Sequence, residues 1–142
     1  MRLMRRFFTL DGQPLNLETL RQGQSFVLLF EAQAETGEAH QAMIMQGLPA
    51  GWEIADRIAA GDVPNMQWLG TLTETVALPA LDDRYAAAVD LTPQRNFARL
   101  AVRLRAVTAG PFELPGGEVA DMYRPAIHAR QATVRVGVLP AE

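Results

Sequence analysis

The sequence predicts an all-β protein built as an antiparallel β-sandwich, with at most one short helix. Short stretches of alternating apolar and polar residues recur along the 142-residue chain. Turn-forming residues separate these stretches roughly every 8 to 12 positions, which is typical of a sandwich. About seven or eight such strands are enough for two packed sheets. We find no internal repeat, low-complexity segment or interdomain linker, so the chain is expected to be one domain.

The first third of the chain contains three predicted strands. Arg5 to Leu10 is a short apolar stretch, and Asp11-Gly12 ends it because this dipeptide favours a tight turn. Ser25 to Ala34 carries large apolar residues on both parities, which predicts a central strand buried on both faces. His40 to Gln46 follows after a turn at Thr36-Gly37-Glu38. We expect these last two strands to form a hairpin.

One stretch predicts a helix. Glu53 to Ala60 has Ile54 and Ile58 four residues apart, with Gly61 where a helix C-cap would lie. Leu15 to Arg21 fits either a single helical turn or a plain loop.

The second half supplies the remaining strands. Thr71 to Val76 is rich in β-branched residues, and Arg84 to Leu91 alternates after a turn. Phe97 to Val107 has apolar residues on one parity and arginines on the other, which predicts one buried face and one solvated face. Ala132 to Val138 repeats the alternation with valines. These four stretches complete the predicted sandwich.

The stretch from Leu114 to Pro125 lies between the last two of these strands and is the predicted functional region. Its prolines and its Gly116-Gly117 pair stop strand pairing, because proline lacks the amide donor. Met122 and Tyr123 are therefore displayed on a connection where polar residues are the norm. We take these two residues as the candidate site.

Composition excludes several classes of function. The net charge is −3, and the 13 basic and 16 acidic residues are scattered, so no basic stripe indicates nucleic acid. There is no cysteine, which excludes a disulfide framework, a thiolate zinc site and a cysteine nucleophile. No apolar run approaches the roughly 18 residues of a membrane span. We therefore expect a soluble chain without direct membrane contact.

The N-terminus is not expected to be a signal peptide. Met1 to Arg6 resembles the basic start of one, but Thr9 to Pro14 is polar where about 7 to 15 apolar residues should stand. We expect this start to be a cut made for expression.

Candidate catalytic residues are few, and no sequence motif of a known catalytic or phosphate-binding site is present. His40 and His128 lie in different strand regions with no carboxylate at a ligand-like offset, so we interpret both as solvent-facing or strand-end residues and expect no metal. Asp82-Asp83 directly precedes a strand, which favours turn capping over acid–base chemistry. Trp52 and Trp68 fit either a sugar-stacking platform or, as is commoner for tryptophan in a sandwich, the core. We therefore predict no enzyme and no cofactor.

Several ordered motifs carry a resemblance to a known family. In chain order they are RRFFTLDGQPL, LRQGQSFVL, GLPAGWEI, MQWLG, LTET, LDDRYAAAVDL, RLRAVTAGPFELP, VADMYRP and IHARQATVRVGV. Together they resemble the last macroglobulin-like domain of bacterial alpha-2-macroglobulins, over nearly the whole chain from about Arg6 to Val138. At one departure, Gln46-Gly47-Leu48 stands where family members often have an aspartate–leucine pair before the proline-alanine-glycine turn.

The resemblance implies an immunoglobulin-like β-sandwich, a single macroglobulin-like domain over residues 1–142, excised from the C-terminus of a much larger chain. In this family a protease cuts a bait region, the molecule rearranges, and a cysteine–glutamine thioester in a separate domain captures the protease. The last domain packs against the thioester domain and keeps water from that bond. Since this chain has no cysteine, it cannot carry the thioester. The implied role is a shielding surface without catalysis.

The resemblance also implies partners and a location. The partners are the thioester domain, the other macroglobulin-like domains of the parent and, through the parent, target proteases. The parent would be periplasmic, with a lipid anchor at the inner membrane as one arrangement. Met122 and Tyr123 fall in the family's MY-x-P motif, which faces the thioester domain.

Two alternatives remain open at the level of sequence. Tyr123 alternatively tucks back onto its own sandwich, with its hydroxyl bonded to nearby backbone as in a tyrosine corner. The chain as a whole alternatively is a free-standing immunoglobulin-like adhesion or carbohydrate-binding module. That function would need Trp52, Trp68 and Tyr123 to form an exposed aromatic platform.

Overall fold

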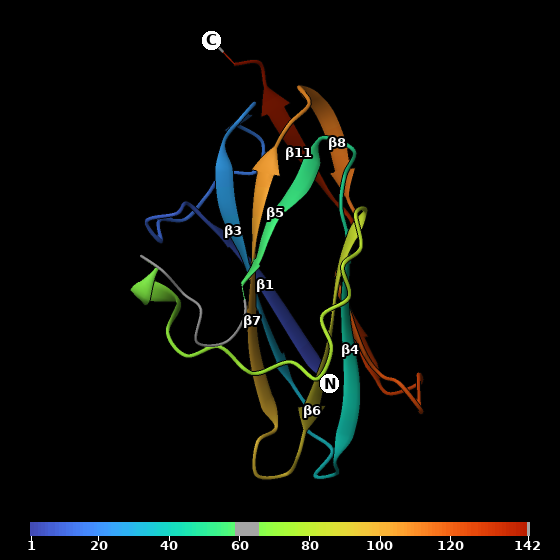
Figure 1. Cartoon of the computed structure of the whole chain (residues 1–142). Coiled ribbons are helices and arrows are strands. Elements are labelled where there is room, and N and C mark those ends of the chain that lie inside the picture. Colours follow the sequence, from blue (N-terminus) through green and yellow to red (C-terminus); the bar gives the residue numbers. More distant parts are fainter. Residues whose placement is uncertain (59–65, 142) are drawn as a thin grey trace.

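A computed structural model describes residues 1–58 and 66–141 (Figure 1). The elements in this part of the chain are, in order, β1 (Arg2–Phe8), β2 (Leu20–Arg21), β3 (Ser25–Gln33), β4 (His40–Gly47), β5 (Trp52–Ile58), the 3-10 helix η1 (Gln67–Leu69), β6 (Arg84–Leu91), β7 (Phe97–Ala106), β8 (Gly110–Leu114), β9 (Glu118–Asp121), β10 (His128–Arg130) and β11 (Val134–Leu139). The predicted all-β class is confirmed.

The strands form two four-stranded sheets and one smaller sheet. Their orders are β1-β3-β7-β5, β10-β9-β4-β6 and β2-β11-β8. The two larger sheets face each other, while β8 and β11 extend the molecule at the end where the C-terminus lies (Figure 1). Pairing is antiparallel except between β11 and β2. β3 is central, with β1 and β7 on its two edges, as the sequence predicts.

The main core fills the space between the two larger sheets. Because side chains alternate along a strand, Phe26, Leu28 and Phe30 of β3 point to the same face and are fully buried there. Ile44 of β4 and Tyr85 of β6 meet them from the opposite sheet. The rings of Phe30 and Tyr85 stack with centroids 5.8 Å apart. Burial of each such side chain contributes about 1.5 to 3 kcal/mol.

A second, smaller cluster covers the outer face of the first sheet. Val27 and Leu29 of β3 lie there with Ala101 of β7, under the segment that contains Leu69 and Leu72. The predicted solvated face of Phe97 to Val107 is therefore wrong in part. The segment that contains Leu69 and Leu72 covers this face of β7, because the apolar residues of β3 and β7 would otherwise face water.

The predicted helix from Glu53 to Ala60 is wrong, and β5 takes its place up to Ile58, with the remaining two residues outside the described part of the chain. β5 contains a bulge between Ile54 and Asp56, opposite Leu104 and Arg103 of β7. An extra residue reverses the alternation of faces. Ile54 accordingly packs against the main core, whereas Ile58 lies in the smaller cluster. Because the bulge interrupts the alternation of faces, the residues of β5 do not show a regular strand period in the sequence.

The predicted hairpin between β3 and β4 is also wrong. β3 pairs with β1 and β7, and β4 pairs with β6 and β9, so the connection crosses from one sheet to the other. Both edges of β3 are occupied by strands that are distant or earlier in the chain. The turn between β3 and β4 bridges two layers instead of closing a hairpin.

Thr71 to Val76 forms no regular strand in the structure. Thr73 N donates to Arg99 O at 2.8 Å, and Val76 N donates to Ala88 O at 2.7 Å, so the segment passes from β7 to β6. The described pairing of β5 with β7 runs from Ala106 to Ala101, and further along β7 Arg99 is bonded by Thr73. The undecided stretch from Leu15 to Arg21 is a turn that leads into the two-residue strand β2.

Candidate functional site

The stretch from Leu114 to Pro125 is more structured than the single connection that the sequence predicts. β8 ends at Leu114, as expected from the proline and glycines that follow, but the chain re-enters a sheet as β9. β9 pairs with β4 on one side and with β10 on the other. The candidate residues Met122 and Tyr123 therefore begin a tight turn between β9 and β10.

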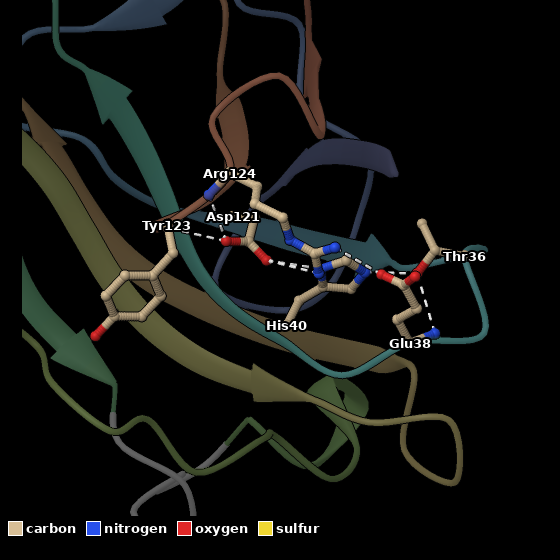
Figure 2. Close-up of polar contacts among 6 residues, drawn as sticks. All are labelled: Thr36, Glu38, His40, Asp121, Tyr123 and Arg124. Atoms are coloured by element: carbon tan, nitrogen blue, oxygen red, sulfur yellow. Dashed lines mark hydrogen bonds and ion pairs between the residues drawn. The ribbon is translucent and has the colours of Figure 1, made fainter.

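Met122 and Tyr123 are both displayed to solvent. Their side chains are 41% and 77% exposed, respectively. Tyr123 points away from the polar cluster beside it (Figure 2). At that exposure the ring does not tuck onto its own sandwich, so the tyrosine-corner alternative does not describe this structure.

The backbone of this turn is held by Asp121, the last residue of β9. One carboxylate oxygen of Asp121, Oδ1, accepts hydrogen bonds from Tyr123 N and Arg124 N, each at 2.8 Å (Figure 2). Asp121 N donates to Ile127 O at 3.0 Å and closes the turn, while Met122 N donates to Gln41 O of β4 at 2.8 Å. Aspartate favours such a turn because its short side chain reaches amides two and three residues ahead.

The second carboxylate oxygen of Asp121 bonds to His40, the first residue of β4. Its Oδ2 lies 2.7 Å from His40 Nδ1, and both residues are only 3% exposed. On the other side of the ring, Nε2 lies 2.5 Å from Thr36 Oγ1. The hydrogen bond from His40 holds the pKa of Asp121 below its ordinary value, against the opposing effect of burial, and the amides of Tyr123 and Arg124 lower it further.

Sequence reasoning missed this pair. His40 begins a strand as expected, but it is buried, and its carboxylate partner is 81 positions away. No spacing rule links residues so distant. The available sequence clue was Asp121 itself, since an aspartate ahead of Arg124-Pro125 favours a turn closed by its side chain.

Arg124 connects the turn to the loop before β4. Its Nη1 donates to Glu38 Oε2 at 2.7 Å, and this hydrogen bond raises the pKa of Arg124. Its Nη2 lies 3.7 Å from Asp121 Oδ2. A pocket of about 380 Å³ lies beside this cluster, with Gln41, Asp90 and Tyr123 in its lining.

The other end of β9 is held by a second buried polar residue of β4. Gln46 is fully buried, and its Nε2 donates to Pro115 O at 2.7 Å. Arg5 of β1 donates from Nη1 to both Gln46 Oε1 and Pro115 O, each at 2.7 Å. A Cβ at Gly116 would lie 1.6 Å from Gln131 O, so glycine is required there by close approach of two backbones.

The remaining sequence candidates do not join Met122 and Tyr123. Trp52 is 5% exposed and packs edge-on against Phe26, with ring centroids 4.9 Å apart. Trp68 packs on Phe8, and its Nε1 donates to Leu10 O at 3.0 Å. Since Trp52 lies in the core, the aromatic platform required by the carbohydrate-binding alternative is not formed.

The polar candidates are equally separate. His128 is exposed, with Nδ1 3.1 Å from Ala126 O. Asp83 Oδ1 lies 3.9 Å from Nε of Arg84, in an exposed pair. Within residues 1–58 and 66–141, no three acidic or histidine side chains are placed to hold a metal ion. The same residues contain no helix long and apolar enough to cross a membrane.

Comparison with known proteins identifies the family. The model of the bacterial alpha-2-macroglobulin MG10 domain matches residues 1–126. This chain belongs to that family. An alpha-2-macroglobulin of Xylella fastidiosa is 33% identical to this chain over an alignment of 137 residues, with 88% of this chain and 8% of the relative covered.

Solved structures agree with the family assignment. Native Escherichia coli alpha-2-macroglobulin is similar with a TM-score of 0.82 and 26% identity, over 97% of this chain and 9% of that one. Salmonella alpha-2-macroglobulin reacted with methylamine is similar with a TM-score of 0.82 and 28% identity, over the same shares. The MG10 domain thus spans less than a tenth of these relatives, and in both structures the matching region is part of a multidomain chain.

Proposed function

We propose that this MG10 domain is the non-catalytic C-terminal domain of a bacterial alpha-2-macroglobulin protease inhibitor, and that it packs against the thioester domain of its parent and shields the thioester. Family membership supports the inhibitor as the parent. The Salmonella relative exists in a form reacted with methylamine. Methylamine is a small amine that opens thioesters, so that relative's chemistry is consistent with a thioester in the parent.

The observation that carries the proposal is the exposure of Met122 and Tyr123. Met122 and Tyr123 are adjacent large apolar side chains that are both exposed on this turn, and contiguous exposed apolar surface is a feature of interaction sites. A thioester persists in water only if solvent and amines are kept away from it. A flexible thioether beside an aromatic ring can fill an irregular gap over such a bond. Met122 and Tyr123 therefore have the side chains expected of a cover that keeps water from a thioester.

The remaining parts of the proposal follow from the same parent. The chain has no cysteine, so the thioester is supplied by another domain and the contribution of this one is a surface. Its partners are the thioester domain and neighbouring macroglobulin-like domains, with target proteases reached through the parent. The proposed location is the periplasm.

The test uses Met122→Ala and Tyr123→Ala in the full-length parent, whose gene should encode a Cys-x-Glu-Gln motif upstream. Thioester loss to water or methylamine is followed by mass spectrometry. Both variants should lose the thioester faster than wild type. Val76→Ala is the matched control, because Val76 is 65% exposed and lies outside this turn. If all three variants keep the wild-type rate, the shielding function is wrong.

A further inference from the structure

The turn after β9 combines a fixed backbone with exposed side chains. Asp121 accepts the amides of both Tyr123 and Arg124, while the neighbouring apolar side chains face solvent. Asp121 is also one of three buried polar side chains in the described part of the chain. Burying a carboxylate is costly unless its hydrogen bonds are satisfied. The turn is therefore held in one backbone conformation by a buried carboxylate.

Hydrogen-bond accounting shows how His40 supports Asp121. An ionised carboxylate only accepts, so His40 Nδ1 carries the proton and donates to Oδ2. In the neutral ring Nε2 then accepts from the hydroxyl of Thr36. The oxygen of Thr36 in turn accepts Glu38 N at 3.2 Å. This chain of bonds joins the loop before β4 to the turn after β9 (Figure 2).

We propose that Asp121, supported by His40, is a positioning residue that fixes the turn so that Met122 and Tyr123 are presented in one arrangement before they contact another domain. The inference rests on the proposed shielding function. An interface loop that is ordered in advance loses less conformational freedom when it docks. For a lid, the same order limits the time during which the surface beneath is open to water.

The first test measures backbone order in this chain by amide hydrogen exchange. Asp121→Ala removes the acceptor of two amides and should speed exchange of Tyr123 N–H and Arg124 N–H by about tenfold or more, as expected for loss of a bond to a charged acceptor. Phe30 N–H in central β3 should keep its rate. Asp121→Asn retains an Oδ1 acceptor and should restore most of the protection.

The matched control is Glu118→Ala at the start of the same strand. Glu118 pairs with Arg130 Nε at 2.7 Å in an exposed ion pair, so its loss should leave the turn amides unchanged. Unchanged exchange of the Tyr123 and Arg124 amides in Asp121→Ala would overturn the inference. So would an equal acceleration at Phe30, because the residue would then act only on global stability.

The second test measures the methylamine reaction of the full-length parent. Asp121→Ala should speed it in the direction of Met122→Ala and Tyr123→Ala, and Glu118→Ala should not. If the Met122 and Tyr123 variants react faster but Asp121→Ala reacts as wild type, the positioning role is wrong and shielding stands. If the Met122 and Tyr123 variants also react as wild type, shielding is wrong, and a positioning role in shielding falls with it.

Discussion

The two ends of β9 are held by the same strand in different ways. At the end near Pro115, the fully buried side chain of Gln46 in β4 binds backbone that is packed closely against other backbone. At the other end, His40 of β4 holds Asp121, and the residues beyond it are exposed. Gln46 thus stabilises contacts inside the domain, at what we call the closed end of β9. His40 supports an exposed turn, at what we call the open end. The difference separates residues needed for folding from those available for docking.

The largest effect should come from the closed end, through Gly116→Ala. The new Cβ would overlap Gln131 O at 1.6 Å, so two segments of backbone would have to separate. We expect a loss of at least about 3 kcal/mol in the free energy of unfolding. Urea denaturation measures it, with Gly47→Ala as control. There the nearest atom is Pro115 Cγ at 3.3 Å, and the cost should stay near 1 kcal/mol, about the lower end for overpacking. Equal costs at both sites would show that the contact is not limiting.

Gln46→Leu should have the next largest effect. The change keeps the volume but removes one acceptor of Arg5 and one of the two donors to Pro115 O. Loss of these hydrogen bonds, one of them from a charged group, should lower the free energy of unfolding by about 1 to 3 kcal/mol. Gln41→Leu on the same strand is exposed and should change it by no more than about 0.5 kcal/mol. Should the two substitutions prove equal, the buried network at this end contributes nothing measurable.

The contribution of Asp121, at the open end, to the free energy of unfolding should decrease in acid. The pKa of Asp121 is lowered from its ordinary value of 3.8, chiefly by the hydrogen bond from His40. A carboxyl group that binds its proton more weakly when folded stabilises the fold above pH 3.8 and loses this contribution as the pH falls through the lowered value. Urea midpoints between about pH 6 and pH 2 should therefore fall more steeply for wild type than for Asp121→Asn. Identical slopes would contradict this assignment.

The smallest effect on the isolated chain should come from Met122→Ala and Tyr123→Ala. Since both side chains are exposed, each change should alter the free energy of unfolding by less than about 1 kcal/mol. A loss of about 3 kcal/mol or more in the same denaturation experiment would mark the residue as part of the core. In that case the contrast between the two ends of β9 would disappear.

The sequence predicts the parts of this molecule that depend on local alternation. β3, β6 and β7 lie close to their predicted ranges, because each keeps one side-chain period from end to end. β5 differs from the predicted helix because one extra residue at its bulge reverses that period and hides the strand pattern. The predicted hairpin between β3 and β4 is wrong for another reason. The strands that pair with β3 and β4 come from distant parts of the chain.

The candidate site was likewise predictable only where it depends on neighbouring residues. The display of Met122 and Tyr123 follows from glycine, proline and apolar residues close together, and the structure agrees. The role of these two residues at an interface remains a prediction. The bond between His40 and Asp121 and the contact of Gln46 with Arg5 join residues 81 and 41 positions apart, respectively. Such pairs arise from the folded topology and leave no pattern in a single sequence.

Arg5 has a practical consequence for where this domain can be cut. Its guanidinium joins the first strand to Pro115 O and, at 3.3 Å, to Ala132 O. The family match ends at residue 126, yet β11 beyond it pairs with both β8 and β2. A fragment trimmed to the family match would leave the edges of two strands bare and invite aggregation. Gene fragments and domain swaps should therefore keep the chain from β1 through β11.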